Sequence, residues 1–474
     1  MVAGPGHRDY FPHPMALSRR FCPIFLLGCW LLAGACNLNG DGAKPPRGTL
    51  YFPMGLALSQ DERYLFVANS NFDRRYGWGS VQAYDLDLLT AQLNTECRGS
   101  TSSGENCTDT GSDECTSTFD CELEPIDVLH SEVLIGSIAR TMVLSSTGDR
   151  LYVPSHADGD ITHVDVDGQG NLSCGGDREC DDRFREVDVS DARDISYPLD
   201  PVAMTTAPVT DLTGSDCGDE ACPTAGEALV VVHRSGVASL LIDQGGEGER
   251  PLLVDVVEDL PSALTGVQYD PARRTFWLTS ATSSSVTSKT LHRLGVYADD
   301  PFEHSFLYDI GDVPIRGVGG TRNTWAVGIA SASSLADQPV VIAQGPDTLL
   351  RLDLSEDEAE AQAVTLTEIG AGASRMALGT LTDSQGAELE LALISCFDSR
   401  SLYVVDVANG AVLSIVPGFN GPFEVALDVS RQQAYVADFR ASVIRIIDLS
   451  PVLSRNGARA MGTLGDPQAP EEFQ

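Results

Sequence analysis

The sequence predicts an all-β fold, a β-propeller of seven four-stranded antiparallel blades. Short runs of β-branched and aromatic residues, separated by Gly, Pro, Asn and Asp turns, recur in groups of four along the chain. One sheet of this size cannot bury both of its faces, so each group needs a neighbour, and a closed ring of sheets supplies one. The sequence shows no helical periodicity of useful length, apart from the acidic stretch Glu356–Glu360.

The first repeat sets the pattern for the others. The apolar run Gly55–Ser59 ends in a polar turn, Tyr64–Ala68 is rich in β-branched and aromatic residues, and Ser80–Leu86 alternates apolar and polar positions. His130–Ile135 is expected to form the outermost strand. The next three repeats place strands at Thr141–Ser145, Leu151–Val153, Asp160–Val166, Val202–Thr206, Ala228–Val232, Val237–Asp243, Leu252–Val257, Gly266–Tyr269, Thr275–Thr279, Thr290–Val296 and Phe306–Ile310. The last three place them at Trp325–Ile329, Val340–Ala343, Thr348–Leu354, Ala363–Ile369, Met376–Leu378, Glu390–Ser395, Ser401–Val407, Val412–Val416, Val425–Val429, Gln433–Ala437, Ser442–Leu449 and Met461–Leu464. A single propeller over residues 48–474 is therefore expected.

The N-terminus predicts export. Two arginines precede the apolar run Phe21–Leu32, which leads into small residues, so residues 1–35 are interpreted as a secretory signal peptide. Met15 is an alternative start that gives a signal of more typical length. The sequence LAGAC that ends at Cys36 resembles the bacterial lipobox, which implies that Cys36 is lipidated and that residues 36–47 tether the domain to a membrane. An ordinary signal peptide with an incidental cysteine is the alternative.

The cysteines predict disulfides formed in an oxidising compartment. Of the 12 cysteines, eight lie in close, even-numbered sets within polar loops. These candidates are Cys97, Cys107, Cys115, Cys121, Cys174, Cys180, Cys217 and Cys222. Zinc binding is the alternative, but the spacings lack paired C-x-x-C units and no histidine joins them. Cys396 follows a predicted strand and is interpreted as a buried thiol rather than a nucleophile.

Three cysteine-rich insertions interrupt the repeats, at residues 96–124, 172–183 and 211–226. The first two are predicted to lie between the third and fourth strands of their repeats, and the last between a first and a second strand. Both kinds of connection emerge on the same face of a four-stranded blade, so all three insertions are expected on one face. Loop growth held by disulfides explains them, and a partner-binding lobe is the functional alternative.

The charge balance excludes one class of partner. Asp and Glu number 68 against 31 Lys and Arg, which gives a formal net charge of −37. Such a surface repels nucleic acid, because nucleic-acid binding depends on basic groups that neutralise phosphates. Solubility in water or a salty medium accounts for the acidity, and a surface that binds cations such as Ca²⁺ is the alternative.

Two strand phrases carry a family resemblance. The phrases RYLFVAN at Arg63–Asn69 and AYVADFRASVIRIIDL at Ala434–Leu449 resemble the YVTN-type propeller repeats of bacterial extracytoplasmic and lactonase-like proteins. The resemblance covers most of the chain from Pro53 onward and implies the propeller fold. It does not select a function, because the family includes enzymes, binding proteins and proteins of unknown role.

Candidate site residues gather at the mouth of the central channel, where each first strand begins. Arg140 and Arg375 occupy matching places in their repeats, and Arg322 is a third candidate. The turns after the second strands, on the same face, add Asn69, His156, His233, Arg234, Asp398, Asp438 and Arg440. Converging guanidinium groups would favour a small carboxylate or phosphate ligand, whereas pairing of each arginine with a neighbouring Asp would only join blades. His156 and His233 come from adjacent blades and would suit a metal or general-base role if they met; isolated surface histidines are the alternative.

Other motifs add little. The segment Asp165–Asn171 resembles a Ca²⁺ loop with oxygen ligands at alternate positions, but it lacks the closing Glu of an EF-hand, and its Asp167-Gly168 pair suits a hairpin turn. The sequence contains no Gly-x-Ser-x-Gly elbow, Walker loop, His-Glu-x-x-His motif or haem motif. No catalytic residue, metal ligand or cofactor is assigned, with Ca²⁺ kept as an option.

The sequence therefore predicts an exported, lipid-anchored propeller of the cell envelope, located in the periplasm or on the outer surface. It would act as a binding or scaffold module for an envelope protein or a small anionic ligand, and contact the membrane only through its lipid anchor. A propeller enzyme of the lactonase or another hydrolase type, with its site at the channel mouth, is the alternative function.

Overall fold

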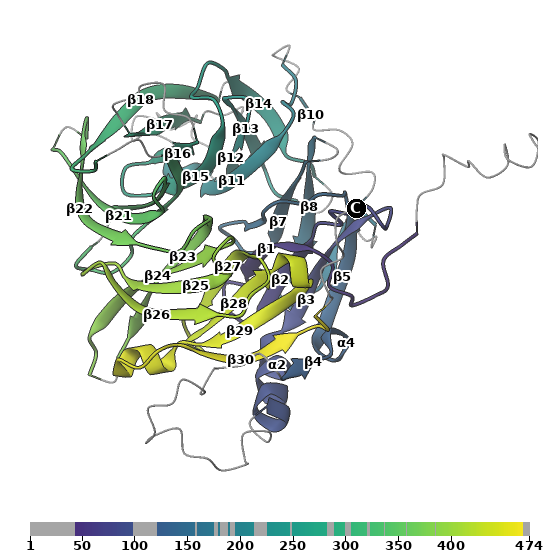
Figure 1. Ribbon diagram of the computed structural model, residues 1–474. Helices are drawn as coiled ribbons and strands as arrows, with labels where there is room; N and C mark the ends of the chain where they lie inside the picture. Colours follow the sequence, from purple (N-terminus) through teal and green to yellow (C-terminus); the bar gives the residue numbers. More distant parts are fainter. Residues whose placement is uncertain are drawn as a thin grey trace, which may run out of the picture. The chain divides into compact units, whose positions relative to one another are not determined.

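The computed structural model describes residues 43–467, except 98–120, 157–158, 175–178, 181–187, 190–194, 213–224, 247–248, 282–288, 299–304, 320–322, 336, 357 and 384. The chain divides into two compact units, Met1–Gly42 and Ala43–Gln474. The described residues all belong to the second unit, which is shown in colour in Figure 1. The predicted signal peptide, Met15 and Cys36 lie outside the described residues.

The strands that the structure describes pair into successive antiparallel groups of four, numbered here as blades 1 to 7 in chain order. Blades 1 and 2 consist of β1 (Pro53–Leu58), β2 (Tyr64–Asn69), β3 (Gly79–Asp85), β5 (Leu129–Ile135), β6 (Val143–Leu144), β7 (Arg150–Ser155), β8 (Asp160–Val166) and β9 (Leu172–Ser173). Blades 3 and 4 consist of β11 (Pro201–Pro208), β12 (Glu227–His233), β13 (Val237–Asp243), β14 (Leu252–Val257), β15 (Leu264–Asp270), β16 (Thr275–Ser280), β17 (Lys289–Tyr297) and β18 (Phe306–Arg316). Blades 5 to 7 consist of β19 (Asn323–Ile329), β20 (Pro339–Gln344), β21 (Thr348–Leu354), β22 (Ala361–Glu368), β23 (Ala373–Thr382), β24 (Glu388–Cys396), β25 (Ser401–Asp406), β26 (Ala411–Pro417), β27 (Pro422–Asp428), β28 (Gln433–Asp438), β29 (Val443–Asp448) and β30 (Arg459–Leu464).

The blades form a closed ring around their first strands. Each first strand contacts the first strand of the next blade, from β1 to β6 and onward to β27, and β27 contacts β1 again. The apolar core clusters of the described residues lie between neighbouring blades, and one of them joins blade 7 to blade 1 through Leu65 and Tyr435. Each sheet thus buries both faces against its neighbours (Figure 1). The predicted β-propeller class is confirmed.

A repeated aromatic residue anchors these clusters. In four blades, a polar residue that closes the turn after the first strand is followed seven positions later by a large ring on the second strand. The pairs are Ser59 with Phe66, Ser145 with Tyr152, Asp270 with Trp277 and Asp428 with Tyr435. The rings are at most 1% exposed. In blade 4 the Trp277 indole N–H donates to Asp270 Oδ2 at 3.0 Å, so the turn and the core side chain stabilise each other.

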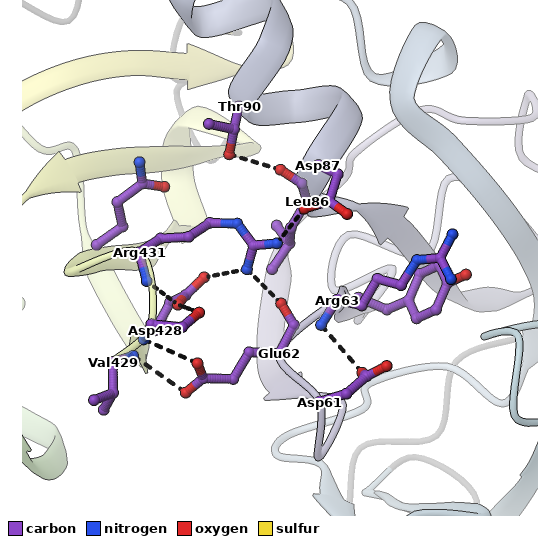
Figure 2. A network of polar contacts seen from close by, with 12 residues as sticks. Asp61, Glu62, Arg63, Leu86, Asp87, Thr90, Asp428, Val429 and Arg431 are labelled. Carbon is purple, nitrogen blue, oxygen red and sulfur yellow. Dashed lines mark hydrogen bonds and ion pairs between the residues drawn. The ribbon is translucent and has the colours of Figure 1, made fainter.

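Polar contacts close the ring on the face of the first-to-second strand turns. Figure 2 shows Arg431, which follows β27, donating to the carbonyl oxygen of Glu62 and to Asp428 Oδ2 (3.0 Å), and pairing with Asp87. The Glu62 carboxylate accepts the backbone N–H of Val429 at 3.2 Å. These contacts join a turn of blade 7 to a turn of blade 1, far apart in the sequence, and so oppose opening of the ring.

The short helices lie between strands. They are α2 (Leu86–Gln92), the π-helical turn η1 (Leu93–Cys97), α4 (Pro125–Val128), α5 (Val209–Leu212) and the 3-10 turns η3 (Phe439–Ala441) and η4 (Ser450–Ser454). Asp85 caps α2 by accepting two of its first backbone N–H groups, and α2 packs Leu86 and Leu89 into the cluster between blades 7 and 1. The acidic Glu356–Glu360 loop lies between β21 and β22, and its described residues form a turn and a bend.

Both disulfides of the described residues hold a short segment against an outer strand. Cys97–Cys121 places Cys121 so that its carbonyl accepts the N–H of Thr463 at 2.8 Å, and β4 (Glu122–Leu123) continues along β30 in parallel. Cys174–Cys180 places the Cys180 N–H on the carbonyl of Leu134, in the outer strand of blade 1, at 3.0 Å. Unpaired outer strands invite association with other chains, so these segments protect the edges.

Other outer strands are paired in the same manner. β10 (Asp188–Val189) runs parallel to β14, and β18 of blade 4 pairs in parallel with β22 of blade 5. The disulfide prediction is confirmed for Cys97, Cys121, Cys174 and Cys180. The candidates Cys107, Cys115, Cys217 and Cys222 lie outside the described residues.

One prediction about the insertions is wrong. The Cys174–Cys180 loop follows β9, the fourth strand of blade 2, and therefore lies in the connection to blade 3 rather than between a third and a fourth strand. Ser173 pairs with Asp165 near the end of β8, so the loop still begins close to the predicted face, that of the first-to-second strand turns. Strand β9 was missed because it has only two residues and is merged with the polar loop in the sequence. The first insertion does lie between the third and fourth strands of blade 1.

Candidate functional site

A β-bulge marks the mouth of the channel in nearly every blade. The register shifts by one residue near the start of β1, β11, β15, β19, β23 and β27. Each shift lies at the beginning of the first strand of a blade, opposite the end of its second strand. Bulges re-aim side chains and are frequent next to functional sites. In blade 7 the bulge covers Phe423 and Glu424, and in blade 6 it precedes Arg375.

Three guanidinium groups converge at this mouth. Arg140 precedes β6, Arg234 follows β12, and Arg375 lies at the bulge of β23. Burial lowers the pKa of the Arg140 guanidinium, and the positive charges of Arg234 and Arg375 lower it further, while the negative charge of Asp200 opposes the shift. The charges of Arg234 and Arg375 thus act on Arg140, and convergence of Arg140 and Arg375 on one ligand stays a prediction. Arg322, the third predicted arginine, lies outside the described residues.

His156 lies in the same group, against a carboxylate. Its Nδ1 is 2.8 Å from Asp200 Oδ1, and Arg234 Nε is 3.7 Å from Asp200 Oδ2. Burial lowers the pKa of His156, with a further lowering from Arg140, while Asp200 opposes the shift. The imidazole is thus held mainly neutral at neutral pH, which is the form that a general base requires.

Glu424 is the titratable partner of Arg375. The nearest atoms of the two side chains, Arg375 Nε and Glu424 Oε2, lie 3.5 Å apart, and the side chains are only 16% and 12% exposed. Burial raises the pKa of Glu424 to about 7, against the opposing effects of Arg375 and of the Val425 N–H. Glu424 therefore changes its charge near neutral pH at the point where a ligand of Arg375 would bind.

Two of the other predicted site residues, His233 and Asn69, are buried and hydrogen-bonded within the protein. His233 is fully buried, its Nδ1 is 3.1 Å from the Leu199 carbonyl, and its Nε2 is 2.8 Å from Ser239 Oγ. Burial lowers its pKa to about 4. Both ring nitrogens have these partners and His156 contacts Asp200, so no contact between the two histidines is present among the described residues. Asn69 is likewise buried and donates to Gln82 Oε1 at 2.9 Å.

The predicted polar residues of blades 6 and 7 divide between structural and surface positions. Asp438 is buried, accepts the Asn420 N–H at 2.8 Å and faces Arg445. Arg440 is exposed and lies over the ring of Phe397 at 4.7 Å. Asp398 lines a polar cavity of about 550 Å³ between blades 5 and 6, together with Asn323, Gln344, Gly345, Asp347, Ala371 and Gly372.

The calcium-like segment and the unpaired cysteine have structural roles. Asp167 accepts the backbone N–H groups of Gln169 and Asn171, both at 2.8 Å, and so closes the hairpin between β8 and β9. Within the described ranges, no group of three or more His, Cys, Asp or Glu side chains is arranged to hold a metal ion. Cys396 is buried, and burial raises its thiol pKa to about 12, so the thiol stays protonated at neutral pH.

Comparisons with known proteins support the fold. The chain matches no protein-family model, and no curated protein matches it in sequence. Hydrazine synthase from Kuenenia stuttgartiensis is similar in structure, with a TM-score of 0.50 and 11% identity over 85% of this chain and 99% of that chain. A putative 6-phosphogluconolactonase from Bacteroides uniformis (TM-score 0.46, 12% identity, 75% and 82% covered) and the C-terminal WD40 domain of Sif2 (0.45, 9%, 89% and 89%) are also similar.

These likenesses concern the fold alone, and the class of protein is a β-propeller. The two disulfides are consistent with export to an oxidising compartment. Among the described residues, no helix has the length and apolar character needed to cross a membrane.

Proposed function

We propose that the protein is a binding module whose channel mouth takes a small anionic ligand with a carboxylate or phosphate group. Arg140 carries this proposal. It is half-buried and lies near two like charges; the charge of Asp200 acts on it, but no ion pair within 4 Å joins it to a carboxylate among the residues that the structure describes. Asp200 already pairs with His156 and Arg234, so it compensates Arg140 only in part, and a bound anion would lower the remaining cost of burying this charge. Arg234 and Arg375, which are held by Asp200 and Glu424, would complete the site.

Removing Arg140 should abolish most of this binding. Inorganic phosphate and succinate are expected to raise the melting temperature of the wild-type protein, because a ligand that binds only the folded state stabilises it. In the Arg140→Ala variant, we expect calorimetric titration to show about 10- to 100-fold weaker binding of these anions. This factor corresponds to the loss of one charge-assisted hydrogen bond. Arg316→Ala, which removes an exposed arginine on outer strand β18, should bind as the wild type does. Binding of neither anion by the wild-type protein would contradict the proposal.

A hydrolase is the second candidate, because His156 is held neutral at 2.8 Å from Asp200. In this proposal His156 activates water and Arg140 stabilises the developing oxyanion of an ester or lactone. The deciding experiment incubates wild type and His156→Ala with a panel of lactones. Turnover that is lost in His156→Ala while phosphate binding persists would favour the enzyme; no turnover by the wild type would favour the binding module.

The proposal includes an exported protein of the YVTN-type family, anchored to a membrane of the cell envelope by a lipid on Cys36. The sequence around Cys36 supports this location, and the disulfides are compatible with it. Metabolic labelling of the full chain with radioactive palmitate should label the wild type and leave Cys36→Ser unlabelled, with Cys396→Ser as the matched control. Equal labelling of all three proteins would argue against lipidation of Cys36.

A further inference from the structure

An acidic cavity lies between blades 2 and 3, on the face opposite to the channel mouth. It has a volume of about 560 Å³ and is lined by the connections from β6 to β7, β8 to β9, β11 to β12 and β13 to β14. These connections all join first to second or third to fourth strands, so the cavity is separate from the anion site at the mouth. The charged residues of its lining are Asp149, Arg150, Asp165, Asp167, Glu227 and Asp243.

Carboxylates outnumber bases five to one among the described residues of this lining. The base, Arg150, is held entirely by the protein: Nη1 donates to Asp243 Oδ2 at 2.7 Å, and Nη2 and Nε donate to Asp165 Oδ1 at 2.9 and 3.1 Å. The same guanidinium also donates to the carbonyl oxygens of Gly246 and Glu249. Because one positive charge is shared by two carboxylates and three more carboxylates remain, the cavity keeps a negative charge that attracts cations.

Two of the remaining carboxylates, Asp149 and Asp167, are ionised at neutral pH. Asp149 accepts the hydroxyls of Ser145 at 2.9 Å and Thr147 at 2.5 Å. Burial alone would raise the pKa of Asp149, but these hydrogen bonds and the charge of Arg150 hold it below its ordinary value. Burial likewise opposes, without outweighing, the hairpin hydrogen bonds that lower the pKa of Asp167. No ion pair within 4 Å joins either carboxylate to a base in the part of the chain that the structure describes.

Glu227 is the carboxylate of the cavity whose hydrogen bonding is incomplete. It begins β12, is only 5% exposed and lines the cavity. Its Oε2 accepts the Ser146 hydroxyl at 2.6 Å, whereas its buried Oε1 accepts no hydrogen bond from the described residues. The neighbouring Thr206 hydroxyl donates to the Leu144 carbonyl instead, at 3.4 Å. Burial raises the pKa of Glu227 and the charge of Asp149 raises it further, while the Ser146 and Thr206 groups oppose the shift. A buried oxygen without a donor costs free energy, which an N–H group of a ligand would recover.

The spacing of these carboxylates suits an organic cation with several charges. They reach the cavity from separate connections, and no group of three or more His, Cys, Asp or Glu side chains in the described ranges is arranged to hold a metal ion. An ammonium group has three N–H donors and no acceptor, so it needs oxygen acceptors such as those of this lining. We propose that the cavity binds a linear polyamine, with one ammonium group donating to Glu227 Oε1 and the others meeting the carboxylates of Asp149 and Asp167.

Calorimetric titration of the full chain with spermidine tests the proposal, at an ionic strength of about 0.15 M that screens general attraction to the acidic surface. Glu227→Gln should bind spermidine about tenfold more weakly than the wild type, because the amide keeps the size of the side chain but carries no charge. Glu388→Gln is the matched control: Glu388 also accepts a serine hydroxyl, from Ser333 at 2.7 Å, but it is exposed at the start of β24. This control and Arg140→Ala should bind spermidine as the wild type does, and Glu227→Gln should bind phosphate as the wild type does.

Ligand chemistry gives a second readout that uses only the wild-type protein. Putrescine and butylamine have the same carbon chain and differ by one ammonium group, so putrescine should bind about tenfold more tightly if separate carboxylates are engaged. Equal affinity for these two amines, or equal affinity of wild type and Glu227→Gln for spermidine, would overturn the proposal. So would binding of Ca²⁺ that excludes spermidine and is lost in Glu227→Gln, since the cavity would then be a metal site.

Discussion

Replacing Arg150 with methionine should lower the free energy of unfolding by about 3–5 kcal/mol, the cost of leaving buried carboxylates without their counter-ion. The Arg150 side chain is 6% exposed, with Nη2 2.9 Å from Asp165 Oδ1 and Nη1 2.7 Å from Asp243 Oδ2. Asp243 also accepts the Tyr152 hydroxyl at 2.7 Å. These groups line a cavity of about 560 Å³ between blades 2 and 3. Arg150 thus joins the two blades through their polar turns.

Chemical denaturation followed by circular dichroism measures this loss. Arg316→Met is the matched control, because Arg316 pairs with Glu360 at the surface, where the two side chains are 59% and 50% exposed. Exposed pairs contribute little, so this variant should stay within about 0.5 kcal/mol of wild type. Adding Asp243→Asn to Arg150→Met should recover part of the loss, since an amide carries no charge. A loss below about 1 kcal/mol in Arg150→Met would show that these carboxylates tolerate its removal.

The strands were predictable because, along most of the chain, the pattern of apolar residues in the sequence agrees with the burial of those residues in the folded protein. The expected Leu252–Val257 coincides with β14, and most other ranges match their strands to within a few residues. Each second strand packs between two neighbouring blades, so nearly all its residues are apolar whichever face they occupy. Strand β9 escaped prediction because two residues carry no periodicity. Helix α2 was not predicted, because its apolar residues directly continue those of strand β3. Asp85, which precedes Leu86 and Leu89, is nevertheless a recognisable N-cap that could have indicated it.

The site was predictable only where the repeats could be aligned. Arg140 and Arg375 were found from their matching positions, and Glu424 occupies the corresponding position of blade 7, so the same alignment could have found it. The identity of each counter-charge was not predictable, because His156 follows β7 of blade 2 and Asp200 precedes β11 of blade 3, and the two meet only when these blades pack together. The same reason hid the acidic cavity between blades 2 and 3, whose carboxylates come from separate connections. His233 was misjudged since the sequence does not show that its ring lies in the core.

Glu424→Gln should remove a pH-dependent loss of stability. Burial raises the pKa of Glu424 from 4.5 to about 7, so the folded protein keeps a proton that the unfolded chain releases. The stabilisation is full below pH 4.5 and is lost as the pH rises through 7, with a total change of about 3 kcal/mol. Other groups titrate alike in both proteins. The free energy of unfolding of the wild type should therefore fall relative to that of Glu424→Gln as the pH is raised from 5 to 8.

The same titration should control binding of anions at the mouth. Above pH 7 the Glu424 carboxylate is ionised 3.5 Å from Arg375 and competes with a bound anion, whereas below pH 7 its proton removes that competition. Succinate is mainly a dianion at pH 6 and fully so at pH 8, so its own titration favours the higher pH; it should nevertheless bind the wild type more tightly at pH 6 than at pH 8. His156 loses positive charge over the same interval, but its lowered pKa limits this effect. Glu424→Gln should bind succinate with nearly equal affinity at both pH values; a wild-type pH dependence that persists in this variant would assign the effect to another group.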